Sequence, residues 1–192
     1  MLNHMMSGCQ VEEADNGECS PVLLVAGAAG SGKTTLGRAV AAALHLAVLD
    51  LDQLTNPLLD ALGSVIPGDH WLSGPHAAQV RAGRYAVLRA AAADLVGLGQ
   101  GAVLIAPFTA ELRGGTEWEE LVTALEPATV WVIHLDGPPE ILAQRRRGRG
   151  ASRDAFRPPD SAPEPPAVPH LRVEVSLSTA EQVELVLRHL EC

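Results

Sequence analysis

Cysteine, lysine and aromatic residues are scarce in this chain of 192 residues. The three cysteines, Cys9, Cys19 and Cys192, all stand near the ends and form no CxxC pair, which argues against a disulfide scaffold or a zinc site. No apolar run approaches the ~20 residues that a membrane span needs, and the acidic N-terminus offers no hydrophobic stretch for a secretion signal. We therefore expect a cytoplasmic protein without a membrane partner.

Basic residues are also fewer than acidic residues. The chain has 14 basic and 23 acidic residues, and its net charge is −9. Nucleic acids and anionic lipids attract basic surfaces, so this balance disfavours a nucleic-acid partner and requires any bound phosphate to meet a local site. Lys33 is the single lysine, and all other basic residues are arginines or histidines.

The hydrophobic content of 47% is enough for one compact core. Residues 1–20 lack helical or strand periodicity, so we interpret them as a disordered tail and residues 21–192 as one domain. Within that domain, apolar runs begin near residues 22, 46, 102, 129 and 171, and helical patterns separate them. This alternation predicts an α/β fold: a three-layer, doubly wound, parallel five-stranded sheet. The main helices are expected at residues 33–44, 76–97, 116–125, 138–147 and 179–190.

A glycine-rich loop follows the first predicted strand. GAAGSGKT at residues 27–34 matches the GxxxxGK[ST] pattern in the required setting, between a strand and a helix. Its backbone N–H groups and the following helix dipole favour a phosphate, Lys33 would contact the β- and γ-phosphates, and Thr34 would bind Mg²⁺. The predicted nucleotide-binding residues of the loop are Gly27, Ala28, Ala29, Gly30, Ser31, Gly32, Lys33, Thr34 and Thr35.

Two acids, Asp50 and Asp52, end the second predicted strand. Strand alternation would place both side chains on one side, at the carboxyl edge where open α/β sheets bind ligands. One would serve magnesium and the other the phosphate acceptor, as possible base; spacing leaves open which does which. Alternatively, Asp52 simply caps the next helix. The third strand ends in IAPF without an acid, which favours the DxD pair as the magnesium site.

Six of the thirteen arginines fall within residues 145–157, in an otherwise acidic protein. We interpret residues 147–158 as an arginine-rich lid in which Arg149 and Arg153 neutralise the transferring phosphoryl group and exclude water. Some of these arginines could instead complement a helix C-terminus. A proline-rich connector, residues 158–170, follows the lid.

The run from Gly27 to Asp52 resembles the opening of the shikimate and gluconate kinases. HLDGPPEILAQRRRGRGASRD is similar to the strand, helix and lid of the wider group of AAA-type ATP-binding proteins that includes chloramphenicol phosphotransferase and zeta-toxin-like kinases. The resemblance implies a P-loop kinase fold, ATP and Mg²⁺ as cofactors, Asp50 on the magnesium side, Asp52 on the acceptor side and Arg145 near adenine. APFTAELR replaces the glycine-rich stretch and arginine of shikimate kinases, and the lid lacks the histidine of gluconate kinases.

We expect the acceptor pocket to be built from the chain segment between the second and third strands and from the loop after the third strand. We favour Asp52, Arg81, Tyr85, Phe108 and Arg113 as substrate-binding residues, within a wider set that also holds His70, Trp71, His76, Arg84, Glu111 and Trp118. The hypothesis is an ATP-dependent phosphotransferase acting on a hydroxyl of a small molecule, either a metabolite or an antibiotic. Alternatives are a sugar-acid or shikimate-like kinase, a nucleotide or nucleic-acid kinase, and a non-catalytic ATP-binding module. The sequence leaves open ATP or GTP, and monomer or homodimer.

Overall fold

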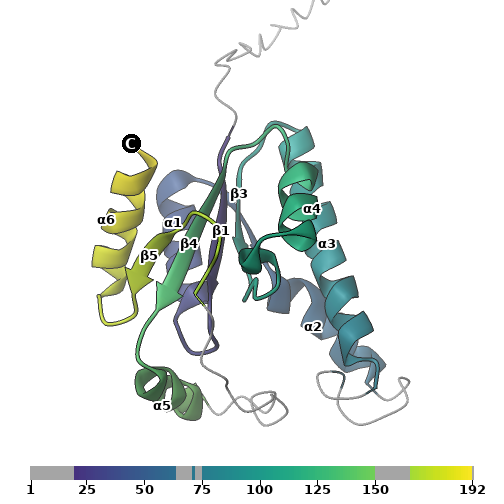
Figure 1. Ribbon diagram of the computed structural model, residues 1–192, viewed down its shortest axis with the longest axis horizontal. Helices are drawn as coiled ribbons and strands as arrows, with labels where there is room; N and C mark the ends of the chain where they lie inside the picture. Colours follow the sequence, from purple (N-terminus) through teal and green to yellow (C-terminus); the bar gives the residue numbers. More distant parts are fainter. Residues whose placement is uncertain (1–19, 64–70, 72–74, 150–164, 192) are drawn as a thin grey trace, which may run out of the picture.

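Five parallel strands form one sheet in the computed structural model, which describes residues 20–63, 71, 75–149 and 165–191 (Figure 1). The strand order is β2-β3-β1-β4-β5, and every neighbouring pair runs parallel. The strands are β1 (Val22–Gly27), β2 (Ala47–Asp50), β3 (Ala102–Ile105), β4 (Val130–Asp136) and β5 (Leu171–Glu174). The predicted doubly wound parallel sheet is confirmed.

Helices cover both faces of this sheet. In Figure 1, α1 and α6 lie on one face and α3 and α4 on the other, while α5 lies beyond the carboxyl ends of the strands. The helices are α1 (Lys33–Leu44), α2 (Leu51–Leu62), α3 (Ala77–Gly97), α4 (Thr116–Ala124), α5 (Pro139–Arg149) and α6 (Thr179–Leu190), with a 3₁₀ turn, η1 (Glu111–Arg113). None of the helices in these described ranges is both long and apolar enough to cross a membrane.

The central strand β1 is covered by helices on both faces, which explains why its sequence is apolar at every position. Leu23 and Val25 belong to the core under α1 and α6, whereas Val22 and Leu24 belong to the core under α3 and α4. All four side chains are completely buried. Because alternate residues of a strand face opposite sides, a strand covered on both faces needs an unbroken apolar run, and β1 has one.

The carboxyl ends of the parallel strands bring the candidate residues to one edge. β1 leads directly into the glycine-rich loop and α1, and β2 leads into α2. Gly37 of α1 lies so close to β3 that an added Cβ would stand 2.6 Å from Ile105 Cδ1. This close approach seats α1 on the sheet and directs its N-terminus toward the ends of β2 and β3.

The second strand is shorter than the sequence indicated. β2 ends at Asp50 and α2 begins at Leu51, so Asp52 lies in the first helical turn, and the expectation that strand alternation aligns the two acids was wrong. The helix cap is also Asp50 and not Asp52, because the Asp50 carboxylate accepts a hydrogen bond from the Asp52 N–H. That bond satisfies a helix N–H that would otherwise lack a partner.

Candidate active site

The glycine-rich loop adopts backbone conformations that its glycines make possible. Gly27, Gly30 and Gly32 all have positive φ, at 136°, 85° and 97°. A Cβ on Gly27 would stand 2.5 Å from the carbonyl oxygen of Leu135, and a Cβ on Gly30 would stand 2.6 Å from that of Leu142. The loop is therefore packed against the end of β4 and against α5, and side chains at these two positions would displace it.

The loop is chemically suited to a phosphate group. Gly32 is the N-cap of α1 and provides no side-chain cap, and the first turn of α1 contains no acid of its own, so its N–H groups and the positive end of the helix dipole favour an anion. Lys33 Nζ donates to the Ala28 carbonyl oxygen at 2.8 Å, which places the ammonium group across the loop. Ser31 Oγ is buried without a hydrogen-bond partner among the described residues. A polar atom in this state is what a bound anion would satisfy.

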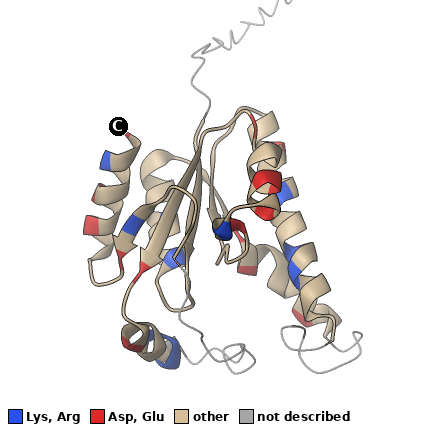
Figure 2. Cartoon of the chain, in the orientation of Figure 1, with Lys and Arg blue, Asp and Glu red and all other residues tan. Residues whose placement is uncertain are grey.

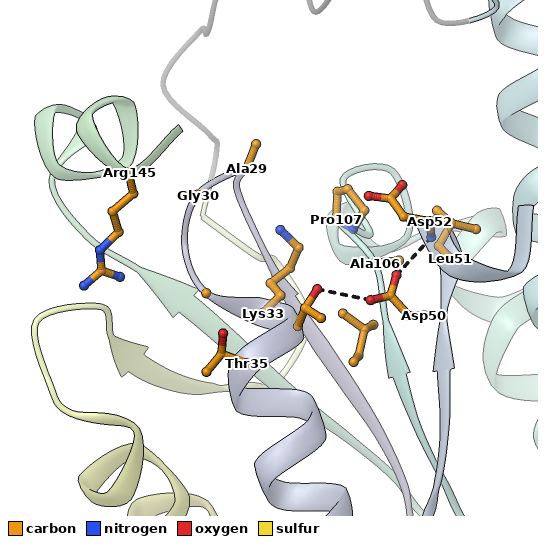
Figure 3. Close-up of a pocket in the computed structure, with 13 residues that line it drawn as sticks. Ala29, Gly30, Lys33, Thr35, Asp50, Leu51, Asp52, Ala106, Pro107 and Arg145 are labelled. Atoms are coloured by element: carbon orange, nitrogen blue, oxygen red, sulfur yellow. Dashed lines mark hydrogen bonds between the residues drawn. The ribbon is translucent and has the colours of Figure 1, made fainter. Parts of the chain in front are cut away.

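Thr34 and Asp50, the two residues predicted to serve Mg²⁺, are hydrogen-bonded to each other beside the loop. Thr34 Oγ1 donates to Asp50 Oδ2 at 3.1 Å, while Asp50 Oδ1 accepts from the Asp52 N–H at 3.0 Å (Figure 3). Asp50 is 6% exposed. A hydroxyl and a carboxylate are the hard oxygen donors that Mg²⁺ takes from a protein, with phosphate oxygens and water completing its shell. The residues present thus fit Mg²⁺, although the described ranges hold no cluster of three or more acidic, histidine or cysteine side chains.

A cavity of about 390 Å³ joins these groups. Figure 3 shows Arg145 on one side of the loop and Asp50, Asp52 and Pro107 on the other, with Lys33 between them. The lining residues are Ala29, Gly30, Gly32, Lys33, Thr34, Thr35, Asp50, Leu51, Asp52, Ile105, Ala106, Pro107 and Arg145. The cavity therefore brings together most of the predicted phosphate loop, both acids and the predicted adenine-side arginine.

Arg145 comes from α5, which carries a row of arginines close to the loop (Figure 2). Its Nη2 donates to the Val175 carbonyl oxygen at 2.9 Å, which links α5 to the turn between β5 and α6. The family resemblance implies that adenine lies near Arg145. Arg149 ends α5, and its side chain lies outside the description, as does Arg153 with the rest of residues 150–164. His70 also lies outside the described residues.

The predicted acceptor residues fall into two groups. Tyr85 and Phe108 are buried in the core, where the Phe108 N–H donates to the Tyr85 hydroxyl at 3.0 Å and the rings meet edge to face. Burial raises the pKa of Tyr85 to about 12, and nearby Glu111 adds to the shift. Neither side chain lines the described cavity, and both pack in the core between the sheet and α3.

Arg81 lies next to this aromatic pair. It forms an ion pair at 3.3 Å with Glu111, whose side chain is 5% exposed, and its guanidinium lies 4.3 Å from the centre of the Tyr85 ring. Arg113 is exposed at the end of η1. The structure thus places Arg81 beside the buried carboxylate of Glu111, and neither arginine lines the described cavity.

Arg84 contacts Asp52 directly, with Nη2 and Oδ1 separated by 2.6 Å. The sequence places Arg84 only in the wider set of acceptor residues. The two residues are 32 positions apart on different helices, and no spacing pattern connects them. The helical period of α3 could have shown only that Arg84 and Leu88 share a face.

Comparison with known proteins identifies the family. A profile of the AAA domain family matches residues 22–164, which run from β1 past the end of α5 and include the whole described cavity. The chain belongs to this family. No curated protein matches the chain.

Solved structures share the AAA domain fold of the chain. A Chloroflexus aurantiacus protein to which a kinase function has been ascribed matches with a TM-score of 0.67 and 23% identity, over 91% of this chain and 98% of its own. A gluconokinase from Sinorhizobium meliloti matches with a TM-score of 0.56 and 18% identity, over 91% and 93%. An APS kinase from Mycobacterium tuberculosis matches with a TM-score of 0.54 and 19% identity, over 91% and 99%. These likenesses establish a P-loop kinase fold and confirm the predicted fold class.

Proposed function

We propose that the protein is a small-molecule kinase that transfers the γ-phosphoryl group of Mg-ATP to a hydroxyl. The observation that carries the proposal is that one cavity is lined by the phosphate loop, the Thr34–Asp50 pair and Asp52. A phosphoryl-transfer enzyme needs these three elements: a cradle for the triphosphate, a metal site beside it and a carboxylate for the nucleophile. The kinase-like fold and the kinases among its structural neighbours support the same assignment.

In the proposed reaction, the acceptor oxygen forms a bond to the γ-phosphorus while the bond from that phosphorus to the bridging oxygen breaks. The electron pair leaves with ADP, and the proton of the acceptor hydroxyl passes to a carboxylate, for which we propose Asp52. Lys33 and the N-terminus of α1 stabilise the negative charge on the phosphates. Magnesium held by Thr34 and Asp50 would neutralise further phosphate charge.

The remaining assignments extend the same hypothesis. We assign Arg145 and the turn after β5 to the adenine side, because Arg145 both lines the cavity and is tied to Val175. Arg149 and Arg153 are proposed to act from the lid. The acceptor is proposed to be a small hydroxylated metabolite or antibiotic, entering beside Asp52 and Pro107, opposite Arg145 (Figure 3).

A screen of hydroxylated compounds with γ-labelled ATP tests the proposal, with labelled product as the readout. Lys33→Ala is expected to abolish transfer, because the loop then loses its only side-chain cation. Arg38→Ala is the matched control, since Arg38 is an exposed residue of the same helix and does not line the cavity. Wild-type turnover in folded Lys33→Ala protein would refute the phosphate-loop assignment. Mg-ATP binding without any labelled product would identify a non-catalytic ATP-binding module.

A further inference from the structure

We propose that Arg84 is a positioning residue that holds the Asp52 carboxylate in the orientation needed to accept the acceptor proton. The inference rests on the proposed function. It differs from a role in binding the acceptor, because the Arg84 side chain reaches the site through Asp52 and does not line the described cavity.

Arg84 is bonded to three side chains of the first turns of α2. Its Nη2 donates to Asp52 Oδ1 at 2.6 Å and to Asn56 Oδ1 at 3.0 Å, and its Nε donates to Thr55 Oγ1 at 2.8 Å. The Thr55 hydroxyl in turn donates to the Leu51 carbonyl oxygen at 2.6 Å, so its proton is engaged and its oxygen accepts from Arg84. All three bonds form in one orientation of the guanidinium. That orientation determines which oxygen of the Asp52 carboxylate, Oδ1, contacts Arg84.

The surroundings of Arg84 further restrict its movement. Its side chain is 11% exposed, and that of Asp52 is 36% exposed. The guanidinium lies 5.0 Å from the centre of the Trp71 ring, and Trp71 Nε1 donates to Asp60 Oδ1 at 3.2 Å. Exposed ion pairs contribute little, because solvent screens the charges and the side chains lose entropy. A guanidinium held by a cation–π contact and by three hydrogen-bond acceptors loses less.

The two acids at the start of α2 are thus anchored to different helices. Asp50 is tied to Thr34 on α1, beside the phosphate loop. Asp52 is tied to Arg84 on α3. The first turn of α2 lies between these anchors, and the Arg84 bond sets how the Asp52 carboxylate is turned relative to the phosphate loop. A displacement of about 1 Å in a reacting group can cost 10²-fold in rate, so this anchor should affect turnover more than binding.

Mg-ATP hydrolysis, with water as acceptor, provides an assay that does not depend on the natural acceptor. For Arg84→Ala we expect kcat to fall about tenfold to hundredfold while KM for Mg-ATP stays within about threefold. Asp52→Asn should lower kcat by about 10²–10⁴-fold, the contribution of a general base. In the double variant, Arg84→Ala should lower kcat by less than about twofold further, because no carboxylate remains to be positioned. Arg84→Lys, which keeps a cation but not the fork, should fall between Arg84→Ala and wild type.

Arg89→Ala is the matched control. Arg89 lies on the same helix and pairs with Glu120 at 3.6 Å, away from the cavity, so its loss should leave kcat unchanged. Equal unfolding midpoints of the single and double variants in urea would show that differences in kcat come from the site.

The result that would overturn the proposal is a multiplicative loss, in which Arg84→Ala lowers kcat equally with and without Asp52. A KM increase at constant kcat would also overturn it and would make Arg84 a binding residue. Failure of the wild-type protein to bind or turn over Mg-ATP would instead reject the proposed function, which is a different outcome from normal turnover in Arg84→Ala.

Discussion

Asp50 combines two roles that a pair of substitutions can separate. Its Oδ1 caps α2 through the Asp52 N–H, and its Oδ2 accepts from the Thr34 hydroxyl, where we place Mg²⁺. Asparagine caps helices as well as aspartate does, because its side-chain carbonyl accepts the same bond. Asp50→Asn should therefore keep the helix cap and lose the metal site, whereas Asp50→Ala should lose both.

The size of each effect follows from these contacts. Loss of a helix cap costs about 1 kcal/mol of unfolding free energy. The hydrogen bond from the Thr34 hydroxyl to Asp50 is also lost, but Thr34 is exposed, so water can replace it. For a domain of this size that cost corresponds to a fall in Tm of about 2–4 °C in Asp50→Ala, against less than about 1 °C in Asp50→Asn. Removal of a carboxylate that orients a metal ligand, such as the Thr34 hydroxyl or a bound water, typically lowers metal affinity about 10–100-fold, and both variants should show this loss.

Thermal unfolding and calorimetric titration with ATP, each with and without Mg²⁺, measure the two effects separately. The expected result is that Mg²⁺ improves ATP binding by the wild type and no longer does so in either variant. Asp50→Asn that is as stable as the wild type and retains its response to Mg²⁺ would refute the metal role. Equal losses of Tm in the two variants would refute the capping role.

Gly27→Ala should destabilise the protein by about 1–3 kcal/mol in urea unfolding and weaken nucleotide binding, because φ is 136° there and the new Cβ would meet the Leu135 carbonyl oxygen at 2.5 Å. Tyr85→Phe should cost about 1–3 kcal/mol, since it removes the acceptor of the buried Phe108 N–H, yet leave kcat and KM unchanged if Tyr85 only packs. Burial of His134 lowers its pKa below the ordinary value of 6.5. The unfolded chain then binds the proton more readily, so His134 contributes stability that is present above about pH 6.5 and is lost as the pH falls below it, and His134→Gln should flatten this dependence in urea unfolding.

The glycine substitution has an internal control in Gly83, which is an α3 residue with open space at its Cβ position. Gly83→Ala should be neutral or stabilising by up to about 1 kcal/mol, because it raises helix propensity without a clash. If Gly27→Ala were as stable as Gly83→Ala, the loop geometry described above would be wrong. Reduced kcat in Tyr85→Phe would return that residue to the acceptor site.

The sequence alone determined those features that depend on local spacing. The unbroken apolar run of β1, the glycines of residues 27–32 and the single lysine fixed a strand, a phosphate loop and a helix in order, because hydrophobic period and backbone freedom are properties of neighbouring residues. From that order, the parallel sheet and the edge at which the site lies followed directly. The presence of Asp50 and Asp52 beside the phosphate loop was also predictable, since strand ends meet at one edge.

Tertiary structure decided what each of those residues contacts. β2 ends at Asp50 and α2 begins at the next residue, so Asp52 lies in the first helical turn, where its carboxylate meets Arg84. Tyr85 and Phe108 are buried in the core because α3 packs against β3. Their positions in the sequence had instead favoured the acceptor pocket. Pairings between helices depend on the distances and angles at which whole elements pack, and no local pattern encodes these quantities.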